Sequence, residues 1–393
     1  MKILVVLPRF PYPLEKGDKL RAYNQIRTLA RHNEIYLFTL SFDEVTEQML
    51  EAVRPFCREI RVARLNKLTG CKNAIRNFLA SKSIQMGYWD SRSSRHQYKA
   101  FEREVGPDVI YSQMVRTMPL VARSLVPKVM DFQDALSLNM KRRMEIYRRG
   151  IRHFLFHFEF KMLRSTEYNS FDIFDDLTII SEPDCEAIPH KRNADLHIIP
   201  NGVDFDYFKP QEVEKKYDVV FCGNMQYRPN VLTAQYLVRE VMPLVWKIVP
   251  GATLLLAGAT PNRQVRALAS DRVIVTGSVE DIRPCYAQSK VFAAPMQIGS
   301  GLQNKLLEAM ALGIPCVTSP LANNALGAAP DREILVGTKA VEIADHIIDL
   351  IQSQPERDEL ARNAMNFVKN NYSWEHFGDA LEKVLYNASK NKL

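Results

Sequence analysis

The sequence contains few cysteines, no long apolar run and no cluster of metal ligands. Its six cysteines form no CxxC or Cys/His group, and its eight histidines show no HExxH or comparable spacing, so neither a zinc site nor a disulfide framework is expected. No stretch approaches the roughly 18 apolar residues that a membrane-spanning helix requires. The first apolar run, residues 3–7, is too short for a signal peptide. These absences predict a cytoplasmic protein without a structural metal. No cofactor is expected.

The chain is long enough for two domains. It has 393 residues, of which 46% are apolar and 25% are charged, an ordinary composition for a globular protein. The net charge of +7 is confined to residues 1–200, which hold 32 Lys and Arg against 24 Asp and Glu. The second half of the chain is therefore close to neutral.

The most basic segment is residues 141–164, where eight Lys and Arg and two acidic residues are mixed with Phe and Leu. Such a surface lies on anionic lipid, binds nucleic acid or is simply the solvated side of a helix. No nucleic-acid-binding motif accompanies the charge, so nucleic acid is the least favoured partner and we expect none. The solvated helix and an anionic membrane surface both stay open.

An alternation of strands and helices starts twice along the chain. It predicts an α/β protein with two doubly wound, Rossmann-like parallel sheets, which bind ligands at the carboxyl ends of their strands. A long helical stretch is expected over residues 136–170. The predicted parts are a first domain over 1–200, a linker over 201–212, a second domain over 213–370 and a terminal helix over 371–393.

The most informative segment is GSGLQNKLLEAMALG. Gly299, Ser300 and Gly301 follow a predicted strand and open a helix that runs to about Leu312. A glycine turn at a helix N-terminus presents unpaired N–H groups and suits a phosphate. Lys305 and Glu308 share one face of this helix. The opposite side, with Leu306, Leu307 and Met310, is expected to be buried. Two interpretations stay open. In one, Lys305 binds a diphosphate and Glu308 binds ribose hydroxyls; in the other, the two form a surface ion pair worth a few tenths of a kcal/mol.

A second candidate site follows the strand at 217–223. Gly223 and Asn224 end this strand, and Arg228 stands before Pro229, which suits the first turn of a helix. An arginine in that place either makes a forked contact with a phosphate or is an ordinary exposed loop residue.

The first half offers a glycine-bearing loop and a pair of carboxylates. Asp18 is expected to cap the helix that follows the loop, and Gly17 either approaches a substrate or supplies a turn. Asp131 lies at the end of the strand expected at 127–132, and Asp134 follows this strand. One of them is predicted to act as a general base or to accept a sugar hydroxyl, and we select Asp134; capping the next helix is the competing role.

Several segments match a known family in their order along the chain. They are PYP…GDKLR, IIPNGVDFDYF, FCGNM…RPN, VTGSVEDIRPCYAQSKVFAAP, GSGLQNKLLEAMALGIPCV and the SW at 373–374. The sequence resembles the retaining GT-B glycosyltransferases, above all glycosyltransferase family 4 and its branch with a GxGxxxKxxEA motif. The resemblance implies two Rossmann-like domains facing across a cleft. The N-terminal domain would bind the acceptor, the C-terminal domain a nucleotide-sugar donor, and the last helix would return to the N-terminal domain.

The resemblance also implies roles for single residues. Glu308 matches the second glutamate of the family's E-x7-E motif, which binds ribose, and Lys305 matches the lysine of the branch motif. Val279 to Ile282 match the region that borders the base. The turn at residues 299–303 matches the main-chain donors that bind the diphosphate in the family. Its residues are Gly299, Ser300, Gly301, Leu302 and Gln303.

The chain departs from the family pattern at two positions. Ser300 stands where the first glutamate of E-x7-E belongs, and Asn224 stands where the family has an arginine after the strand glycine. Our hypothesis is that Arg228 and Lys305 together neutralise the donor phosphates.

The resemblance implies transfer of a hexose from a nucleoside-diphosphate sugar to a hydroxyl of a glycan, a lipid-linked or another anionic acceptor, as in polysaccharide biosynthesis. Retention of the anomeric configuration and independence from metals are part of this expectation. Two alternatives stay open: a sugar-nucleotide epimerase or hydrolase on the same fold, and a non-catalytic nucleotide-binding protein. The basic segment 141–164 adds the prediction of peripheral attachment to the inner face of the cell membrane.

Overall fold

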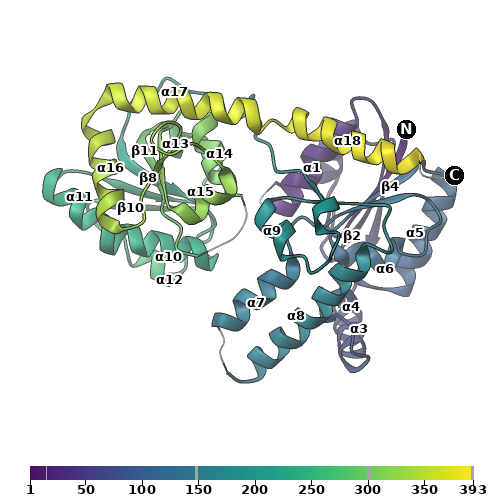
Figure 1. Cartoon of the computed structure of the whole chain (residues 1–393). Helices are drawn as coiled ribbons and strands as arrows, with labels where there is room; N and C mark the ends of the chain where they lie inside the picture. The colour runs from purple at the N-terminus through teal and green to yellow at the C-terminus, as the bar shows by residue number, and fades with distance from the viewer. Residues whose placement is uncertain (15, 147–148, 299–301, 391–393) are drawn as a thin grey trace. The chain divides into compact units, whose positions relative to one another are not determined.

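The computed structural model describes residues 1–14, 16–146, 149–298 and 302–390. The chain forms two compact units: unit 1 comprises Met1–Pro200 and Trp374–Leu393, and unit 2 comprises Asn201–Ser373. Each unit is a parallel β-sheet covered by helices (Figure 1). The predicted α/β class with two Rossmann-like units is therefore confirmed.

The sheet of unit 1 has seven parallel strands: β1 (Lys2–Leu7), β2 (Glu34–Ser41), β3 (Glu59–Arg64), β4 (Val109–Gln113), β5 (Lys128–Asp131), β6 (Asp176–Ile179) and β7 (His197–Ile198). Their spatial order is β3-β2-β1-β4-β5-β6-β7, so the strand order reverses between β1 and β4. The side chains of residues 3–7 in β1 are all 0% exposed, because helices cover both faces of a parallel sheet. Apolar clusters on the two faces form the core.

Two helices far apart in sequence pack together on one face of this sheet, α1 (Gly17–Leu29) and α18 (Trp374–Lys390). A Cβ on Gly378 would lie 2.0 Å from Cγ2 of Thr28, so this approach requires glycine. The other helices of unit 1 are α2 (Glu47–Val53), α3 (Lys67–Leu79), α4 (Ile84–Trp89), α5 (Arg92–Val105), α6 (Met118–Val121), α7 (Leu136–Ile146), α8 (Ile151–Ser170) and α9 (Glu182–Ala187).

The helical stretch expected over residues 136–170 is confirmed in its bounds. It consists of two packed helices, α7 and α8 (Figure 1). Gly150 precedes α8 with φ of +88°, a conformation outside the right-handed helix that glycine adopts readily. The basic segment 141–164 therefore spans the connection between two helices. Phe78 of α3 packs edge-on against Phe158 of α8, with ring centroids 4.7 Å apart.

The sheet of unit 2 has six parallel strands: β8 (Tyr217–Cys222), β9 (Leu254–Ala257), β10 (Val273–Gly277), β11 (Ser289–Ala294), β12 (Cys316–Thr318) and β13 (Leu335–Val336). Their spatial order is β10-β9-β8-β11-β12-β13, which reverses between β8 and β11. The helices are α10 (Arg228–Tyr236), α11 (Met242–Ile248), α12 (Arg263–Arg266), α13 (Arg283–Ala287), α14 (Asn304–Ala311), α15 (Pro320–Leu326), α16 (Ala340–Gln352) and α17 (Gln354–Asn371).

Candidate functional site

The helix that carries the main candidate residues, α14, follows β11 in unit 2. Leu306, Leu307 and Met310 are at most 1% exposed, which confirms the side predicted to be buried. The helix begins at Asn304 rather than at the glycine turn, so Lys305 lies in its first turn. Its end near Gly313, whose φ is +70°, agrees with the prediction. The predicted turn residues Gly299, Ser300 and Gly301 lie outside the described residues.

The ammonium group of Lys305 is held by an asparagine from another helix. Its Nζ donates to Oδ1 of Asn230 over 2.5 Å and lies 5.0 Å from the ring centroid of Phe221. Lys305 is half-buried. Burial lowers the pKa of this lysine to about 8, against the opposing charge of Glu308. The lysine is therefore a cation that has lost much of its hydration without gaining a carboxylate partner.

The carboxylate of Glu308 is held by a buried tyrosine. The hydroxyl of Tyr286, which is 0% exposed, donates to Oε2 of Glu308 over 2.9 Å. Burial raises the pKa of Glu308, and both the tyrosine hydrogen bond and the charge of Lys305 oppose the rise. The described residues show no ion pair between Lys305 and Glu308. The alternative interpretation of these two residues as a surface ion pair is therefore wrong.

Asn230 joins the two candidate segments of unit 2. Its Nδ2 donates to the carbonyl oxygen of Asn224 over 3.0 Å while its Oδ1 accepts from Lys305. A Cβ on Gly223 would lie 2.6 Å from Nδ2 of Asn230, so the glycine makes room for the asparagine. The sequence analysis missed Asn230 as a site residue. Its available signal was its place directly after Pro229, which puts it in the first turn of α10 beside the strand end.

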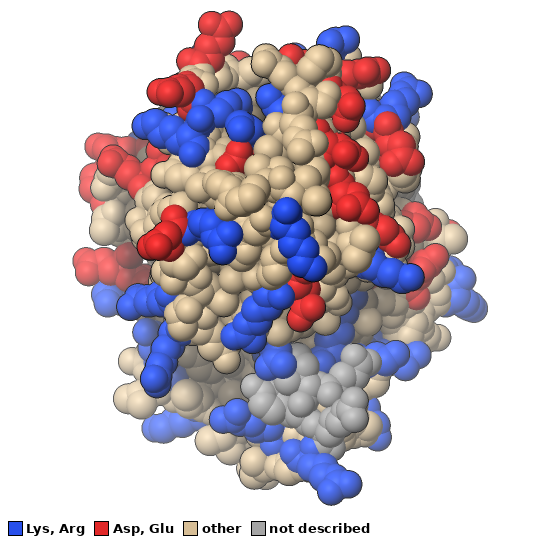
Figure 2. Space-filling view, turned by 90° about the vertical axis from the view of Figure 1, so that its left-hand side faces the viewer, with Lys and Arg blue, Asp and Glu red and all other residues tan. Residues whose placement is uncertain are grey.

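Asn224 and Arg228 lie at the surface of the same loop. Asn224 turns the chain, since its Oδ1 accepts from the main-chain N–H of Gln226 over 2.9 Å. Arg228 is the first residue of α10 and is exposed, and it makes no ion pair with any described residue. No contact joins it to Lys305. On the face of the molecule shown in Figure 2, Lys and Arg side chains predominate over Asp and Glu in the lower part.

The predicted base region lies between β10 and α13. Val279 is 36% exposed and Ile282 is partly buried. Beside them, Arg283 contacts both carboxylate oxygens of Asp281 at 2.7–3.0 Å and stacks 3.9 Å from the ring centroid of Tyr207. The sequence analysis missed this tyrosine, because nothing local connects residue 207 with residue 283. Leu302 and Gln303, the described part of the turn, are partly buried ahead of α14.

The carboxylate of Asp131 in unit 1 is already occupied. It is 0% exposed and receives Nε of Arg21 at 2.6 Å and Nη2 at 3.0 Å. Tyr111 and Thr178 donate to it as well, each over 3.0 Å. The expectation that it offers a base to a substrate is therefore wrong for Asp131, because every lone pair already accepts a hydrogen bond.

Asp134 and Gly17 keep access to solvent. Asp134 has exposed surface. Its carboxylate is nevertheless partly removed from water, and this desolvation raises its pKa to about 6, with a smaller contribution from the nearby charge of Asp184. Gly17 is the first residue of α1, and a Cβ there would meet no atom within 4 Å. Asp18 lies in the first turn of α1, whereas Lys16 occupies the N-cap position. The prediction that Asp18 caps this helix was therefore wrong. Its carboxylate instead pairs with Nη1 of Arg9 at 2.7 Å.

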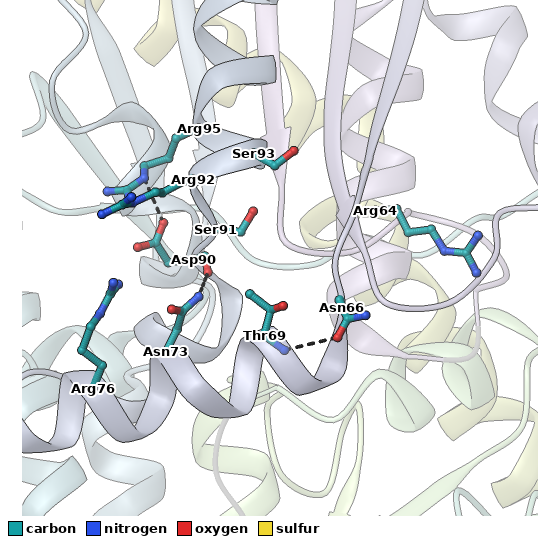
Figure 3. A pocket seen from close by; sticks show the side chains of 10 residues that line it. All are labelled: Arg64, Asn66, Thr69, Asn73, Arg76, Asp90, Ser91, Arg92, Ser93 and Arg95. Carbon is teal, nitrogen blue, oxygen red and sulfur yellow. Dashed lines mark hydrogen bonds and ion pairs between the residues drawn. The ribbon is translucent and has the colours of Figure 1, made fainter.

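A second basic feature of unit 1 is a pocket of about 330 Å³ where β3 meets the N-terminal ends of α3 and α5. Figure 3 shows Arg76, Arg92 and Arg95 around Asp90, whereas Arg64 points away from them. Nε of Arg95 lies 3.3 Å from Oδ1 of Asp90. The sequence analysis did not predict this pocket.

Among the described residues, every helix is too short or too polar to span a membrane. No three His, Cys, Asp or Glu side chains in this part of the chain are grouped as a metal site would require. Asp204 and Asp206, a pair that resembles a metal signature, belong to a turn in which Oδ1 of Asp204 accepts from two main-chain N–H groups.

Comparison with known proteins identifies the class of unit 2. Residues 216–353 match the family model Glycosyl transferases group 1. An uncharacterized 44.6 kDa protein in the cps region of Klebsiella pneumoniae is 23% identical over 393 residues, covering 94% of this chain and 96% of that protein. The chain therefore carries a glycosyltransferase domain.

Solved structures extend the likeness to the whole fold. HepE from Anabaena, in complex with UDP-glucose, superposes with a TM-score of 0.69 at 14% identity, covering 98% of this chain and 99% of that one. Sucrose-phosphate synthase from Thermosynechococcus elongatus gives 0.68 at 15% identity over the same shares. TarM gives 0.71 at 11% identity, covering 99% of this chain and 98% of that one. The chain has the GT-B fold.

Proposed function

We propose that this protein transfers a sugar from a nucleoside-diphosphate sugar to a hydroxyl of a glycan, a lipid-linked or another anionic acceptor, with retention of configuration and without a metal. One observation carries the proposal. In the domain that matches the group 1 family, Lys305 and Glu308 are held by the neutral partners Asn230 and Tyr286, so both charges remain for a ligand. HepE, which shares the fold, was solved with UDP-glucose.

The donor is proposed to bind along the carboxyl ends of β8 and β11. Lys305 and Arg228 contact the diphosphate, and the strand end at Gly223 and Asn224 lets the main chain approach it. The N–H groups of residues 299–303 serve as further donors. Glu308 accepts hydrogen bonds from two ribose hydroxyls, and Val279 and Ile282 border the base.

Catalysis is proposed to rest on charge stabilisation. As the glycosidic bond to the diphosphate breaks, negative charge grows on the leaving oxygen, and cations and N–H groups already in place stabilise it. An incoming diphosphate raises the pKa of Lys305 again, because a nearby anion favours the ammonium form. The half-buried lysine is therefore fully charged when the donor is bound.

Retention requires that the acceptor hydroxyl attack from the side of the leaving group. The hydroxyl oxygen forms the new bond to the anomeric carbon, the bond to the diphosphate breaks, and the hydroxyl proton passes to the diphosphate. Asp134 of unit 1 is proposed to accept a hydrogen bond from the acceptor. With a pKa of about 6, its carboxylate is mostly ionised at neutral pH.

Attachment to an anionic membrane is also part of the proposal. Helices α3 and α8, joined through Phe78 and Phe158, expose apolar side chains beside Lys and Arg, the combination that settles at a lipid interface. The exposed apolar residues include Ile75 (61%), Leu79 (77%), Ile151 (76%) and Phe154 (56%).

A donor screen scored by released nucleoside diphosphate tests the transfer. Rapid release only with an acceptor glycan or glycolipid, unaffected by EDTA, is the expected result, and NMR of the product reports its configuration. Release without any acceptor would indicate a hydrolase, and a donor consumed without diphosphate release would indicate an epimerase. Calorimetry with a panel of nucleoside diphosphates that shows no binding would leave only a non-catalytic protein.

Co-sedimentation with phosphatidylglycerol vesicles at low salt tests the attachment. We expect the wild type to sediment and the double variant Ile151→Ser/Phe154→Ser to stay in solution. Leu125→Ser is the matched control, because Leu125 is 98% exposed outside these helices. Equal sedimentation of all three proteins would contradict attachment through α8.

A further inference from the structure

Two arginines of unit 1 follow the two strands between which the strand order reverses. Arg9 follows β1, and Arg116 follows β4 in the short 3-10 helix Val115–Thr117. In open parallel sheets, ligands bind outside the carboxyl ends of the strands at this reversal. The two side chains therefore stand at the place in unit 1 that the topology favours for a ligand.

Arg116 is a largely buried cation without a counter-ion. Its Nη2 donates to Oε1 of Gln85 over 2.8 Å, its Nη1 lies 3.8 Å from Sδ of Met114, and its buried Nε has no partner. No carboxylate among the described residues forms an ion pair with it. Burial, together with the charge of Arg9, lowers its pKa to about 10. Proteins normally pair buried charges, so this arginine lacks the anion that its surroundings require.

Both guanidinium groups lie near the ring of one tryptophan, Trp89. The Cζ atoms of Arg9 and Arg116 lie 5.4 and 5.7 Å from the ring centroid of Trp89. This ring is 8% exposed and packs edge-on against Phe42 at 4.9 Å. The positions of both arginines are thus set by packing as well as by charge.

The other charges near Arg116 do not supply the missing anion. Asp18 pairs with Arg9 at 2.7 Å, and Arg143 adds a further positive charge. Both carboxylate oxygens of Glu159 already accept hydrogen bonds, from the Ser83 hydroxyl and from the main-chain N–H groups of residues 84 and 85. An anion that enters this cluster meets a net positive environment.

We propose that Arg9 and Arg116 bind an oxyanion of the acceptor, a phosphate or a sugar carboxylate. Guanidinium groups donate in a planar fork that matches both groups. The inference rests on the proposed transfer reaction and deepens it, since it defines an anionic acceptor and the residues that recognise the anion.

Thermal unfolding with added inorganic phosphate or glucuronate tests the site without any turnover. We expect the Tm of the wild type to rise with one of the two probes, which also distinguishes the phosphate from the carboxylate. Arg116→Met should abolish this shift, and Arg9→Gln should reduce it. The Tm of Arg116→Met without a probe should equal or exceed that of the wild type, because the variant removes an uncompensated buried cation; a purely structural arginine would lower it.

Two controls separate this site from others. Lys305→Met should keep the shift, because the donor site lies in unit 2. Arg92→Met should keep it too, because Arg92 lines the pocket of Figure 3. Three outcomes would overturn the proposal. The Tm of the wild type does not shift with either probe, the shift is unchanged in both Arg116→Met and Arg9→Gln, or the shift is lost in Arg92→Met. In that case, transfer to a neutral acceptor would still release nucleoside diphosphate from the donor. Failure of the proposed anion site is therefore distinguishable from failure of the proposed transfer reaction.

Discussion

The two units treat charge at the carboxyl edges of their sheets in opposite ways. In unit 1, Arg21 and Asp131 are 1% and 0% exposed and pair through two hydrogen bonds. In unit 2, Lys305 and Glu308 lie three residues apart on one helix face, yet each contacts a neutral partner instead of the other. Neither of these two is fully buried.

This difference separates a structural pair from a binding pair. A buried pair whose hydrogen bonds are all satisfied fixes the packing and has nothing left to offer a ligand. Two opposite charges that contact neutral groups instead of each other remain available to a ligand that has both an anionic group and hydroxyl groups. Substitutions at the two edges should therefore affect different properties.

The largest effect is expected from breaking the buried pair of unit 1. Asp131→Ala leaves Arg21 charged and unpaired, so we expect the free energy of unfolding to fall by about 3–5 kcal/mol, measured by urea denaturation. The double variant Arg21→Met/Asp131→Leu is the control and should lose much less, because no charge is left unpaired. Equal losses in both variants would show that the pair acts by packing alone.

Removing the cation of unit 2 should affect catalysis and spare stability. We expect Lys305→Met to lower kcat/KM by on the order of 100- to 1000-fold, with the Tm unchanged. Lys247→Met, at an exposed lysine of α11, is the matched control. Full kcat/KM in Lys305→Met would contradict the comparison between the two units.

Removing the anion of unit 2 should mainly weaken donor binding. Glu308→Gln keeps the shape of the side chain but loses charge-assisted hydrogen bonds to the ribose, each worth about 1.5–3 kcal/mol. We expect the KM for the donor to rise on the order of tenfold to a hundredfold, with a smaller change in kcat. A fall in kcat at constant KM would place Glu308 at the reacting atoms instead.

The pH dependence should report the lowered pKa of Lys305. The free enzyme needs the ammonium form, so kcat/KM should be constant between about pH 7 and the pKa of the lysine and decrease as the pH rises through about 8, by about tenfold per pH unit once the lysine is neutral. Lys305→Arg should move this decline to higher pH, because arginine stays charged. A decline at the same pH in both proteins would assign it to another group.

The smallest effect is expected at the tyrosine that holds Glu308. Tyr286→Phe removes one hydrogen bond, worth about 1 kcal/mol, so the KM for the donor should rise about fivefold while the carboxylate remains. Tyr386→Phe, the same change at an exposed tyrosine of α18 in unit 1, should leave the KM unaltered. An unchanged KM in Tyr286→Phe would show that Glu308 is oriented by the helix alone.

Local patterns were enough to predict much of the fold and part of the site. The apolar strands and the buried side of α14 follow from periodicity, and Lys305 and Glu308 share a face because of their spacing. The break between α7 and α8 was missed, although Gly150 marks it, because the apolar and basic pattern continues across it. The interpretation of Asp131 failed because its place after a strand does not show which side chain faces it.

The sequence by itself determined the α/β class, the two sheets and the segments that hold the candidate residues, since these depend on neighbours within a few positions. Only the tertiary structure decided which partner each charge has. Arg21 meets Asp131 across 110 residues, Lys305 meets Asn230 across 75, and Glu308 meets Tyr286 across 22. Such pairs form because the sheets bring distant strand ends to one edge, where hydrogen bonding and burial select the contacts.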